Sequence, residues 1–261
     1  MADLFLPVLM YHRISKNKGA ENYTVSSEDF YKQMQYLHEQ GFKSLTTDDI
    51  PDLGEGEYKK IIMITFDDGC VTDYTEAYPI LKKYGFKATF FVNTDQVAKD
   101  GYMDWGQILE LQREGNKIES HTHTHPNYIS LLKEDMIRGE LAISKKTIEG
   151  KLNTPAVSLS LPGGDYSRKI KKIADEVGYE YVFVSKPGRN PLSLKRRNVF
   201  SRIAIMQRTS LERFRGIVNN DSFISNLNTV NYYLKLIAKK IIGARRYYHL
   251  WNKYFKLRGK K

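Results

Sequence analysis

KIIMITFDDG, residues 60–69, is an apolar, β-branched run that ends in two carboxylates and a glycine. The part from Ile61 to Phe66 predicts a buried strand, because a short continuous apolar segment bounded by turn residues is typical of a strand covered on both faces. Asp67 and Asp68 then lie at the carboxyl end of this strand. Side chains alternate along a strand, but a tight Asp-Asp-Gly turn can aim both carboxylates at one site.

Further strands and helices are expected to alternate on either side of this segment. The expected strands lie at 6–14, 61–66, 88–92, 115–120, 156–161, 181–184 and around Ile203, and the expected helices at 26–38, 75–84, 105–113, 133–151 and 167–177. This order predicts an α/β fold with parallel strands under a helical layer. The chain has 261 residues, which suits one barrel domain with a sizeable core.

A histidine cluster, HTHTHP at residues 121–126, follows the expected strand at 115–120. His121 and His125 are four residues apart, so one helical turn or a tight loop brings both imidazoles to one side. With the two carboxylates they supply three metal ligands and a spare carboxylate, which is the composition of a hydrolytic zinc site with a general base. Taken singly, the acidic pair also fits a turn with a helix cap, and the histidines also fit a solvated loop.

Together, TFDDG at 65–69 and HTHTHP at 121–126 resemble the first two motifs of the polysaccharide deacetylase family, also called the NodB-homology or carbohydrate esterase family 4 group. The resemblance implies a distorted (β/α)7-type barrel and a metal-dependent deacetylase. It implies that Asp67 is the catalytic base, that Thr122 braces the second motif and that His123 is a neighbour of the site. The implied metal ligands are Asp68, His121 and His125.

The N-terminal segment LPVLMYHRI, residues 6–14, is an apolar strand that ends near His12. The family usually carries its acid histidine on a strand near the C-terminus, whereas His249 lies in a basic, tyrosine-rich tail with no strand before it. The segment therefore resembles the circularly permuted branch that includes poly-N-acetylglucosamine deacetylases, in which this motif stands first. A barrel tolerates such a permutation because its termini lie close together. The resemblance implies that His12 is the general acid; the alternative is a surface histidine after a strand.

A third motif of the family is present in altered form after the strand at 156–161. The family has Arg-x-Pro-Tyr-Gly or Tyr-Pro-Phe-Gly there, and this chain has Pro162-Gly163-Gly164. The backbone N–H of Gly163, after Pro162, is expected to stabilise the oxyanion of the reaction. The arginine that commonly orients the base is missing, and Arg202 is the candidate replacement from another strand.

Apolar side chains are expected to wall the pocket for an acetyl methyl group. Trp105 and Tyr11 are candidates, with core packing as the alternative for each. Cys70 follows the acidic pair and is expected to be a small buried residue, because a single thiol without a nearby histidine in sequence is typically inert.

The basic charge is concentrated in the last forty residues. We expect the barrel domain to cover residues 1–221 and a basic C-terminal extension to cover residues 222–261, which hold ten of the basic residues and no acid. Removing these ten from the net charge of +11 leaves +1. An apolar stripe recurs there at helical spacing: Leu234, Ile237, Ile241 and Tyr248. Three interpretations stay open: a helix packed on the barrel, an amphipathic helix on an anionic membrane surface, and nucleic-acid binding, which nothing else in the chain favours.

One cysteine excludes an intramolecular disulfide and fits a reducing compartment. We find no secretory signal pattern and no segment that fits a membrane span. The expected location is therefore the cytoplasm, with peripheral attachment to the inner face of the membrane through the basic extension.

The sequence predicts a metal-dependent N-deacetylase that acts on an N-acetylated amino sugar in a polysaccharide or a lipid-linked glycan. Zn²⁺ is the expected metal, and Co²⁺, Ni²⁺ or Fe²⁺ fit the same ligands. Two alternatives remain: a hydrolase of another amide, such as a formamide or a cyclic imide, and a catalytically silent barrel that binds a glycan.

Overall fold

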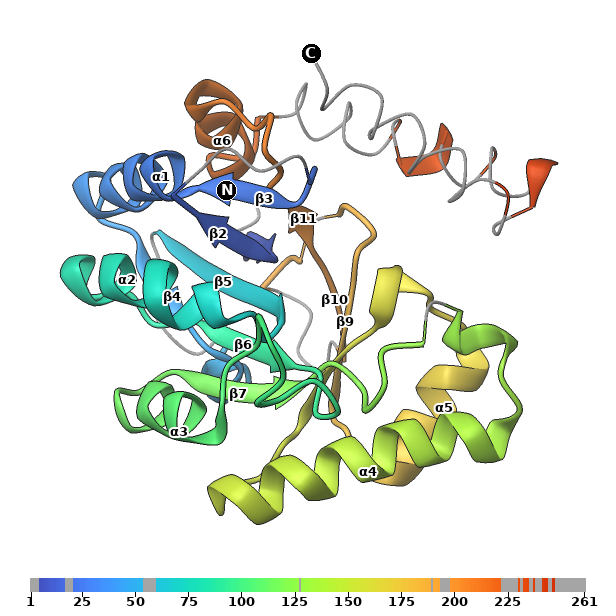
Figure 1. Cartoon of the computed structure of the whole chain (residues 1–261). Helices are drawn as coiled ribbons and strands as arrows, with labels where there is room; N and C mark the ends of the chain where they lie inside the picture. Colours follow the sequence, from blue (N-terminus) through green and yellow to red (C-terminus); the bar gives the residue numbers. More distant parts are fainter. Residues whose placement is uncertain are drawn as a thin grey trace.

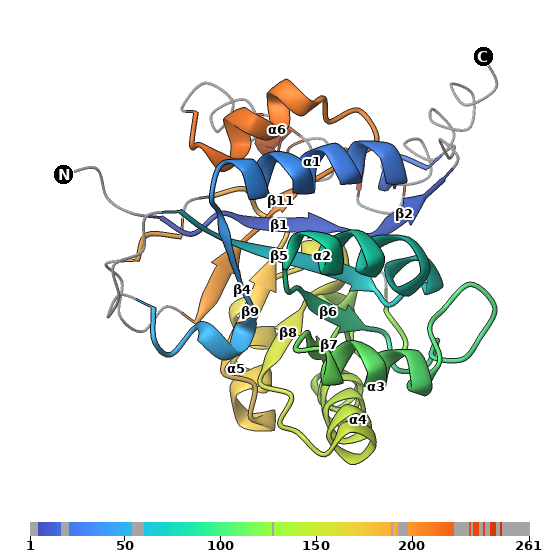
Figure 2. The same ribbon diagram turned by 90° about the vertical axis from the view of Figure 1, so that its left-hand side faces the viewer.

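The structure is a computed structural model of the whole chain. It describes residues 5–16, 21–53, 60–126, 128–188, 190–192, 198–221, 230, 232–234, 237, 241–243 and 246. A parallel sheet lies at the centre and helices surround it, as Figures 1 and 2 show from two directions.

Within the described residues, the main sheet has nine strands, all paired in parallel. Their spatial order is β10 (Val199–Ser201), β9 (Tyr181–Val184), β8 (Ser158–Ser160), β7 (Lys117–Ser120), β6 (Thr89–Val92), β5 (Ile61–Asp68), β1 (Val8–Tyr11) and β11 (Ile203–Ala204), with β4 (Lys43–Leu45) paired to the start of β5. A separate two-stranded sheet joins β2 (Arg13–Ser15) to β3 (Thr24–Ser26).

The two ends of this strand order are neighbours in the chain. Only Arg202 separates β10 from β11, so the chain itself joins the first strand of the order to the last. If β10 and β11 are taken as one strand interrupted at Arg202, and β4 is left out because it only pairs with the start of β5, seven strand positions result. The predicted distorted (β/α)7 barrel is therefore confirmed, and β1, from the N-terminus, occupies the position between β5 and β11 that the permuted arrangement requires.

Six helices cover the outside of the barrel in the described residues (Figure 2). They are α1 (Ser27–Glu39), α2 (Tyr78–Tyr84), α3 (Trp105–Arg113), α4 (Glu134–Leu152), α5 (Arg168–Val177) and α6 (Leu211–Val218). Side-chain caps set several of their starts: Ser26 accepts the N–H of Asp29 at α1, and Asp104 accepts the N–H of Gln107 at α3. An αL residue, Gly85, ends α2.

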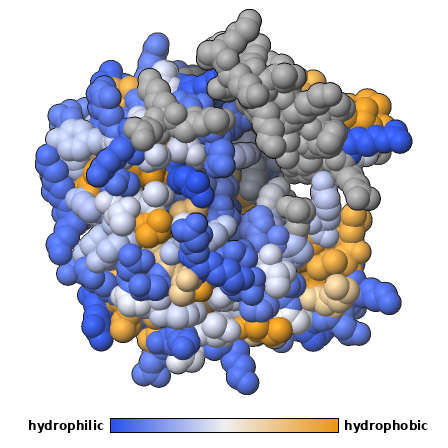
Figure 3. Space-filling model, viewed as in Figure 1, coloured by the Kyte–Doolittle hydropathy of each residue, from blue (hydrophilic) through white to orange (hydrophobic). Residues whose placement is uncertain are grey.

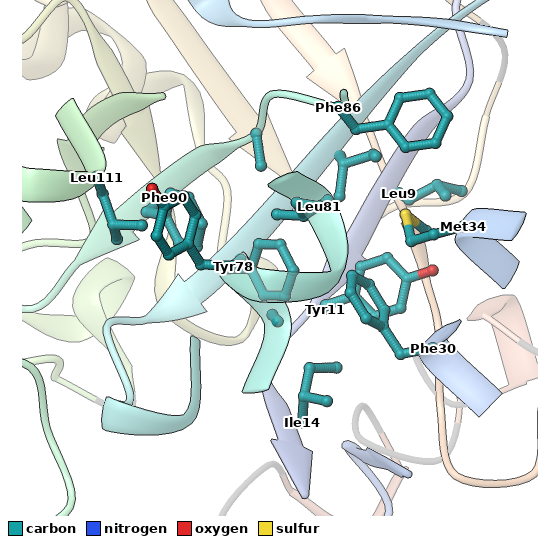
Figure 4. Packing of buried hydrophobic residues seen from close by; sticks show 14 of the residues in the cluster. Leu9, Tyr11, Ile14, Phe30, Met34, Tyr78, Leu81, Phe86, Phe90 and Leu111 are labelled. Carbon is teal, nitrogen blue, oxygen red and sulfur yellow. The ribbon is translucent and has the colours of Figure 1, made fainter. Parts of the chain in front are cut away.

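Alternation along the strands divides the apolar side chains between two layers. Ile62, Ile64 and Phe66 of β5 point outward into the cluster shown in Figure 4, where α1 contributes Phe30 and α2 contributes Leu81. Other strand residues fill the barrel interior in a second cluster that includes Val8, Met63, Phe91, Phe183 and Phe200. Each large apolar side chain that is fully buried contributes on the order of 1.5–3 kcal/mol.

The carboxyl end of the barrel interior is polar instead of apolar. Thr65, Asp67, Ser160 and Arg202 are buried there. Phe91 and Phe183 of the apolar cluster lie beside them, paired in register with Asp67 and Ser160. On the face shown in Figure 3, apolar residues lie scattered among hydrophilic ones.

Some expected elements differ from the structure. The strands β3, β4 and β10 and the helix α6 were not predicted. The strand expected at 6–14 is divided into β1 and β2, and the helix expected at 75–84 begins as a π-helical turn, Asp73–Ala77, before α2. Most of the predicted extension at 222–261 lies outside the described residues; positions 230, 232–234, 237, 241, 242 and 246 are helical. The boundary at residue 221 stays a prediction. Among the described residues, we find no helix with the length and apolarity that crossing a membrane requires.

Candidate active site

Polar side chains from several parallel strands meet at the carboxyl end of the barrel. Asp67 and Asp68 end β5, and His12 follows its neighbour β1. His121 follows β7, and Arg202 stands between β10 and β11. Parallel α/β sheets place their ligand sites at this edge because the strand ends and the loops after them converge there.

Asp68, His121 and His125 bring one ligand atom each to a common point. The Nε2 atoms of His121 and His125 lie 3.5 and 3.6 Å from Oδ1 of Asp68, and the two imidazole centroids are 4.8 Å apart. Ligand atoms of a tetrahedral zinc ion are separated by roughly 3.3 Å, given bonds of about 2.0–2.1 Å. The three residues therefore fit a divalent metal. Among the described residues, they form the one cluster of three or more His, Cys, Asp or Glu side chains with the spacing of metal ligands.

A hydrogen bond sets the tautomer of His121. Its Nδ1 lies 2.9 Å from the carbonyl oxygen of Ser160, so Nδ1–H donates and Nε2 keeps its lone pair for a ligand bond. Burial lowers the pKa of His121 to about 4, although the nearby carboxylate of Asp67 acts in the opposite direction. The net effect leaves the imidazole neutral near pH 7, which is the form that binds metal.

Backbone geometry explains how two consecutive aspartates serve one site. Asp67 points into the barrel, so regular alternation would point Asp68 outward. Asp68 instead has φ of 80°, an uncommon conformation for a residue with a Cβ. This left-handed turn re-aims its carboxylate toward the two histidines. A tight turn at this point is what the Asp-Asp-Gly sequence predicts.

Asp67 forms a buried ion pair with Arg202. Nη1 of Arg202 donates to Oδ1 of Asp67 at 2.7 Å, and Nη2 donates to Oδ2 at 2.8 Å. The hydroxyl of Ser160 accepts from Nη2 at 2.7 Å and donates to Oδ2 of Asp67 at 3.2 Å. The side chains of Arg202 and Asp67 are only 0 and 3% exposed. Arg202 thus reaches the carboxylate from a different strand, at the place where the motif arginine is missing.

Charge outweighs burial at this carboxylate. Burial alone would raise the pKa of Asp67, but the Arg202 guanidinium, with His121 and His12, holds that pKa well below its usual range. Asp67 is therefore ionised at neutral pH, which is the form of a carboxyl group that can accept a proton.

His12 lies in the turn between β1 and β2 and faces Tyr23, with ring centroids 4.6 Å apart. Its Nδ1 is buried and makes no hydrogen bond within the described part of the chain. Because Tyr11 pairs with Phe66 across the two strands, His12 is next to Asp67 in register. The base and acid candidates thus come from adjacent strands.

The altered third motif forms a short helical turn, Pro162–Gly164, directly beyond β8. Gly163 has φ of 58° and Gly164 has φ of 68°, so both adopt the left-handed conformation that glycine favours. A Cβ on Gly164 would lie 2.7 Å from Cβ of Ser185. Pro162 and Gly163 are therefore held at the end of the strand that also supplies Ser160.

The second motif is a tight loop and not a helical turn. The hydroxyl of Thr122 accepts the N–H of His125 at 3.2 Å, and Thr122 is fully buried. His123 points elsewhere: its Nδ1 lies 3.0 Å from the hydroxyl of Thr94, and it is not part of the ligand group.

Tyr11 and Trp105 do not line the site. Tyr11 is fully buried in the outer apolar layer and its hydroxyl donates to Gln33 of α1 at 2.7 Å, because alternation along β1 turns Tyr11 outward when His12 points inward. Trp105 packs against the same outer layer, with Nζ of Lys151 6.0 Å from its ring. Core packing is therefore the correct interpretation of both. Cys70 is buried as expected, and burial raises its pKa to about 12.

Sequence reasoning missed Ser160, which contacts both members of the ion pair and, through its carbonyl, His121. A signal was present. Ser158 and Ser160 alternate with the apolar Leu159 in an otherwise buried strand, which places two hydroxyls on the inward face.

Comparison with known proteins gives consistent similarities. A family model described as polysaccharide deacetylase matches residues 54–182. The chain is 33% identical over 186 residues to YxkH of Bacillus subtilis (strain 168), a protein named as a polysaccharide deacetylase, with 70% of this chain and 65% of YxkH covered. It is 29% identical over 194 residues to the poly-β-1,6-N-acetyl-D-glucosamine N-deacetylase of Staphylococcus aureus (strain MRSA252), with 66% and 63% covered. The chain thus spans less than two thirds of the length of each relative.

A solved structure shares the fold over most of its length. The Streptococcus pyogenes deacetylase PplD, determined in complex with acetate, superposes with a TM-score of 0.76 at 26% identity, covering 83% of this chain and 99% of that one.

Proposed function

Since the chain belongs to the polysaccharide deacetylase family, we propose that it is a metal-dependent hydrolase that removes the N-acetyl group from an amino sugar in a glycan. One observation carries the proposal: a three-residue metal-ligand group lies beside a buried carboxylate with its own arginine partner. The names of the relatives support an N-acetylated glycan as the substrate class.

In the proposed reaction, Asp67 is the general base. One of its carboxylate oxygens accepts a proton from the water that attacks the acetamide carbonyl. Four hydrogen bonds fix the orientation of this carboxylate. Arg202 donates two to the carboxylate, Ser160 donates one to it, and Arg202 donates one to the hydroxyl of Ser160. The N–H of Gly163 donates to the oxygen that becomes negative during the attack. His12 gives a proton to the nitrogen of the departing amine.

A divalent ion fits the ligand group, with Asp68, His121 and His125 as its protein ligands. When bound, it supplies Lewis-acid chemistry by lowering the pKa of water and polarising the carbonyl. Zn²⁺ is our proposal because two imidazoles and one carboxylate are typical zinc ligands; Co²⁺, Ni²⁺ and Fe²⁺ are the competitors.

The ion pair also bears on the alternative of a silent barrel. That alternative rested on the missing motif arginine, and Arg202 supplies a bidentate partner for Asp67. The geometry therefore favours an active enzyme.

The test is acetate release from N-acetylglucosamine oligomers by zinc-loaded protein, compared with Asp67→Asn. Loss of a general base typically costs about 10²–10⁴-fold in rate, so we expect release by the parent and a loss of that order in the variant. Equal rates would contradict the role of Asp67. If zinc binds and no acetate appears, an N-acetylated glucosamine oligomer is the wrong substrate, and a formylated or lipid-linked sugar is tested next.

We propose further that residues 222–261 attach the protein to an anionic membrane surface, on the cytoplasmic face. In the described part of this segment, the apolar stripe is exposed: Leu234, Ile237 and Ile241 are 58, 54 and 76% exposed. That exposure favours an amphipathic surface helix over a helix that packs its stripe on the barrel. The ten basic residues of the segment complement anionic lipid, and each one near the surface contributes about 1 kcal/mol. A lipid-linked glycan would then be within reach.

The membrane proposal is tested with vesicles of phosphatidylglycerol and phosphatidylcholine. Replacing Leu234, Ile237 and Ile241 by serine should reduce co-sedimentation of the full chain at least tenfold while sparing activity on a soluble oligomer. Leu131→Ser is the matched control, since Leu131 is 77% exposed elsewhere on the molecule. Equal sedimentation of the triple variant and the parent would refute the attachment.

A further inference from the structure

The loop that carries both histidine ligands has an unfavourable backbone conformation. Thr122 has φ of 68° and His125 has φ of 56°, and neither is glycine. Residues with a Cβ seldom adopt the left-handed region, so surrounding contacts must hold the loop in this form.

Hydrogen bonds account for all five backbone N–H groups from 121 to 125. The N–H of His121 donates to the carbonyl of Val92 at 2.9 Å, that of Thr122 to the hydroxyl of Ser120 at 3.1 Å, and that of His125 to the hydroxyl of Thr122 at 3.2 Å. These three acceptors belong to the end of β6, the end of β7 and the loop itself. The two remaining N–H groups, of His123 and Thr124, depend on an acceptor from elsewhere.

That acceptor is Glu140, in the second turn of α4. Its Oε2 accepts the N–H of His123 at 3.0 Å and the N–H of Thr124 at 2.8 Å, while Oε1 accepts the hydroxyl of Thr124 at 2.6 Å. One carboxylate therefore makes three contacts with the middle of the loop, between the two ligands.

We propose that Glu140 is a positioning residue that holds the loop 121–125 in the conformation in which His121 and His125 bind the metal. The inference rests on the proposed metal site, and it adds a residue to that site from a helix that contributes no ligand. Without Glu140, two adjacent N–H groups lose their partner, and the strained backbone can relax so that the two imidazoles separate.

The contact geometry predicts that glutamine can replace Glu140. Both N–H donors use the same oxygen, Oε2, so the single carbonyl of a glutamine can accept both. Its amide nitrogen, in the place of Oε1, can donate to the hydroxyl of Thr124, which only needs to rotate. Alanine can make none of these contacts. The pair Glu140→Gln and Glu140→Ala therefore separates the contacts from the charge.

The experiment measures Zn²⁺ affinity of the full chain by competition with a chromophoric chelator, together with the Co²⁺ absorption spectrum and the thermal unfolding of the metal-free protein. Loss of an outer-shell partner typically costs 10–100-fold in metal affinity. We expect a loss of about that size in Glu140→Ala with an altered Co²⁺ spectrum, and affinity within about threefold of the parent in Glu140→Gln. Asp135→Ala, which removes an exposed acid from the same helix, should bind as the parent does.

Three outcomes would overturn the inference. Glu140→Ala that binds Zn²⁺ like the parent, with a lower melting temperature only, would make Glu140 a docking contact for α4. Equal losses in the glutamine and alanine variants would make its charge, and not its contacts, the important property. A parent chain that binds no metal would refute the metal site itself, and with it the proposed function.

Discussion

Replacing Arg202 by methionine tests whether the ion pair with Asp67 is a requirement of the fold as well as of the site. The variant keeps the length and apolar stem of the side chain and removes the guanidinium. Asp67, whose side chain is 3% exposed, then keeps only the hydroxyl of Ser160, at 3.2 Å. Breaking a buried pair by removing one partner typically costs about 3–5 kcal/mol, because the remaining charge is left without compensation.

The pH dependence of this loss has a definite sign. In the parent, Arg202 lowers the pKa of Asp67, so the stabilisation is complete above the ordinary carboxyl value of about 3.9 and is lost only as the pH falls through the lower folded value. In Arg202→Met, burial raises the pKa of Asp67 instead, and ionisation then opposes folding. The deficit in unfolding free energy should therefore be larger at pH 7 than at pH 4.

The assay is urea unfolding of metal-free protein at both pH values, with Asp67→Asn/Arg202→Met as the control. The double variant has no buried charge at this point, so it should be more stable than Arg202→Met at pH 7. A single variant within about 1 kcal/mol of the parent at pH 7 would refute the reasoning, since a buried unpaired carboxylate cannot cost so little. A double variant no more stable than the single one would also refute it, because the loss would then come from packing.

Three further predictions concern two glycines, a buried carboxyl group and a buried thiol. Gly164→Ala should lower the melting temperature by many degrees, because the new Cβ would lie 2.7 Å from Cβ of Ser185 at a left-handed φ of 68°. Gly139 lies within α4, and a Cβ added there would meet no atom within 4 Å. Gly139→Ala should therefore raise the unfolding free energy by up to about 1 kcal/mol. Burial raises the pKa of the Glu119 carboxyl group from its ordinary value of 4.5 to about 8. The unfolding free energy of the parent should therefore fall as the pH rises from 4.5 to about 8. Glu119→Gln should lack this pH dependence in urea unfolding measured across that range. The thiol of Cys70, with its pKa raised to about 12, should react with a disulfide reagent at pH 8 only after unfolding; rapid labelling of the native protein would contradict its burial.

The sequence contained enough to predict most of the barrel. β5 and α3 were predicted closely because one is a long apolar run and the other begins with a capping residue, Asp104. By contrast, β10 and β11 were not separated, since their two short pieces are interrupted by Arg202. No local pattern marks β4, which has three residues and depends on its pairing with β5.

The members of the site were predicted, but their geometry was not. Motif spacing identified the ligand group, and Arg202 was predicted as the candidate partner of the base. The bidentate geometry of that pair joins residues 135 positions apart and depends on how the barrel closes. The choice between pocket wall and core packing stayed open for Tyr11 because alternation was not carried through β1 as far as His12. Glu140 was not considered, because nothing in a helix sequence indicates that one of its acids will meet a loop.

Closure of the barrel at Arg202 has a consequence for the order of folding. The metal ligands lie between residues 68 and 125, so a growing chain carries all of them well before the last strands emerge. The sheet can close, and Asp67 can gain its partner, only once residue 202 is available. Until residue 202 is in place, Asp67 lacks the guanidinium that lowers its pKa, so the altered acidity of the base depends on the closure of the barrel.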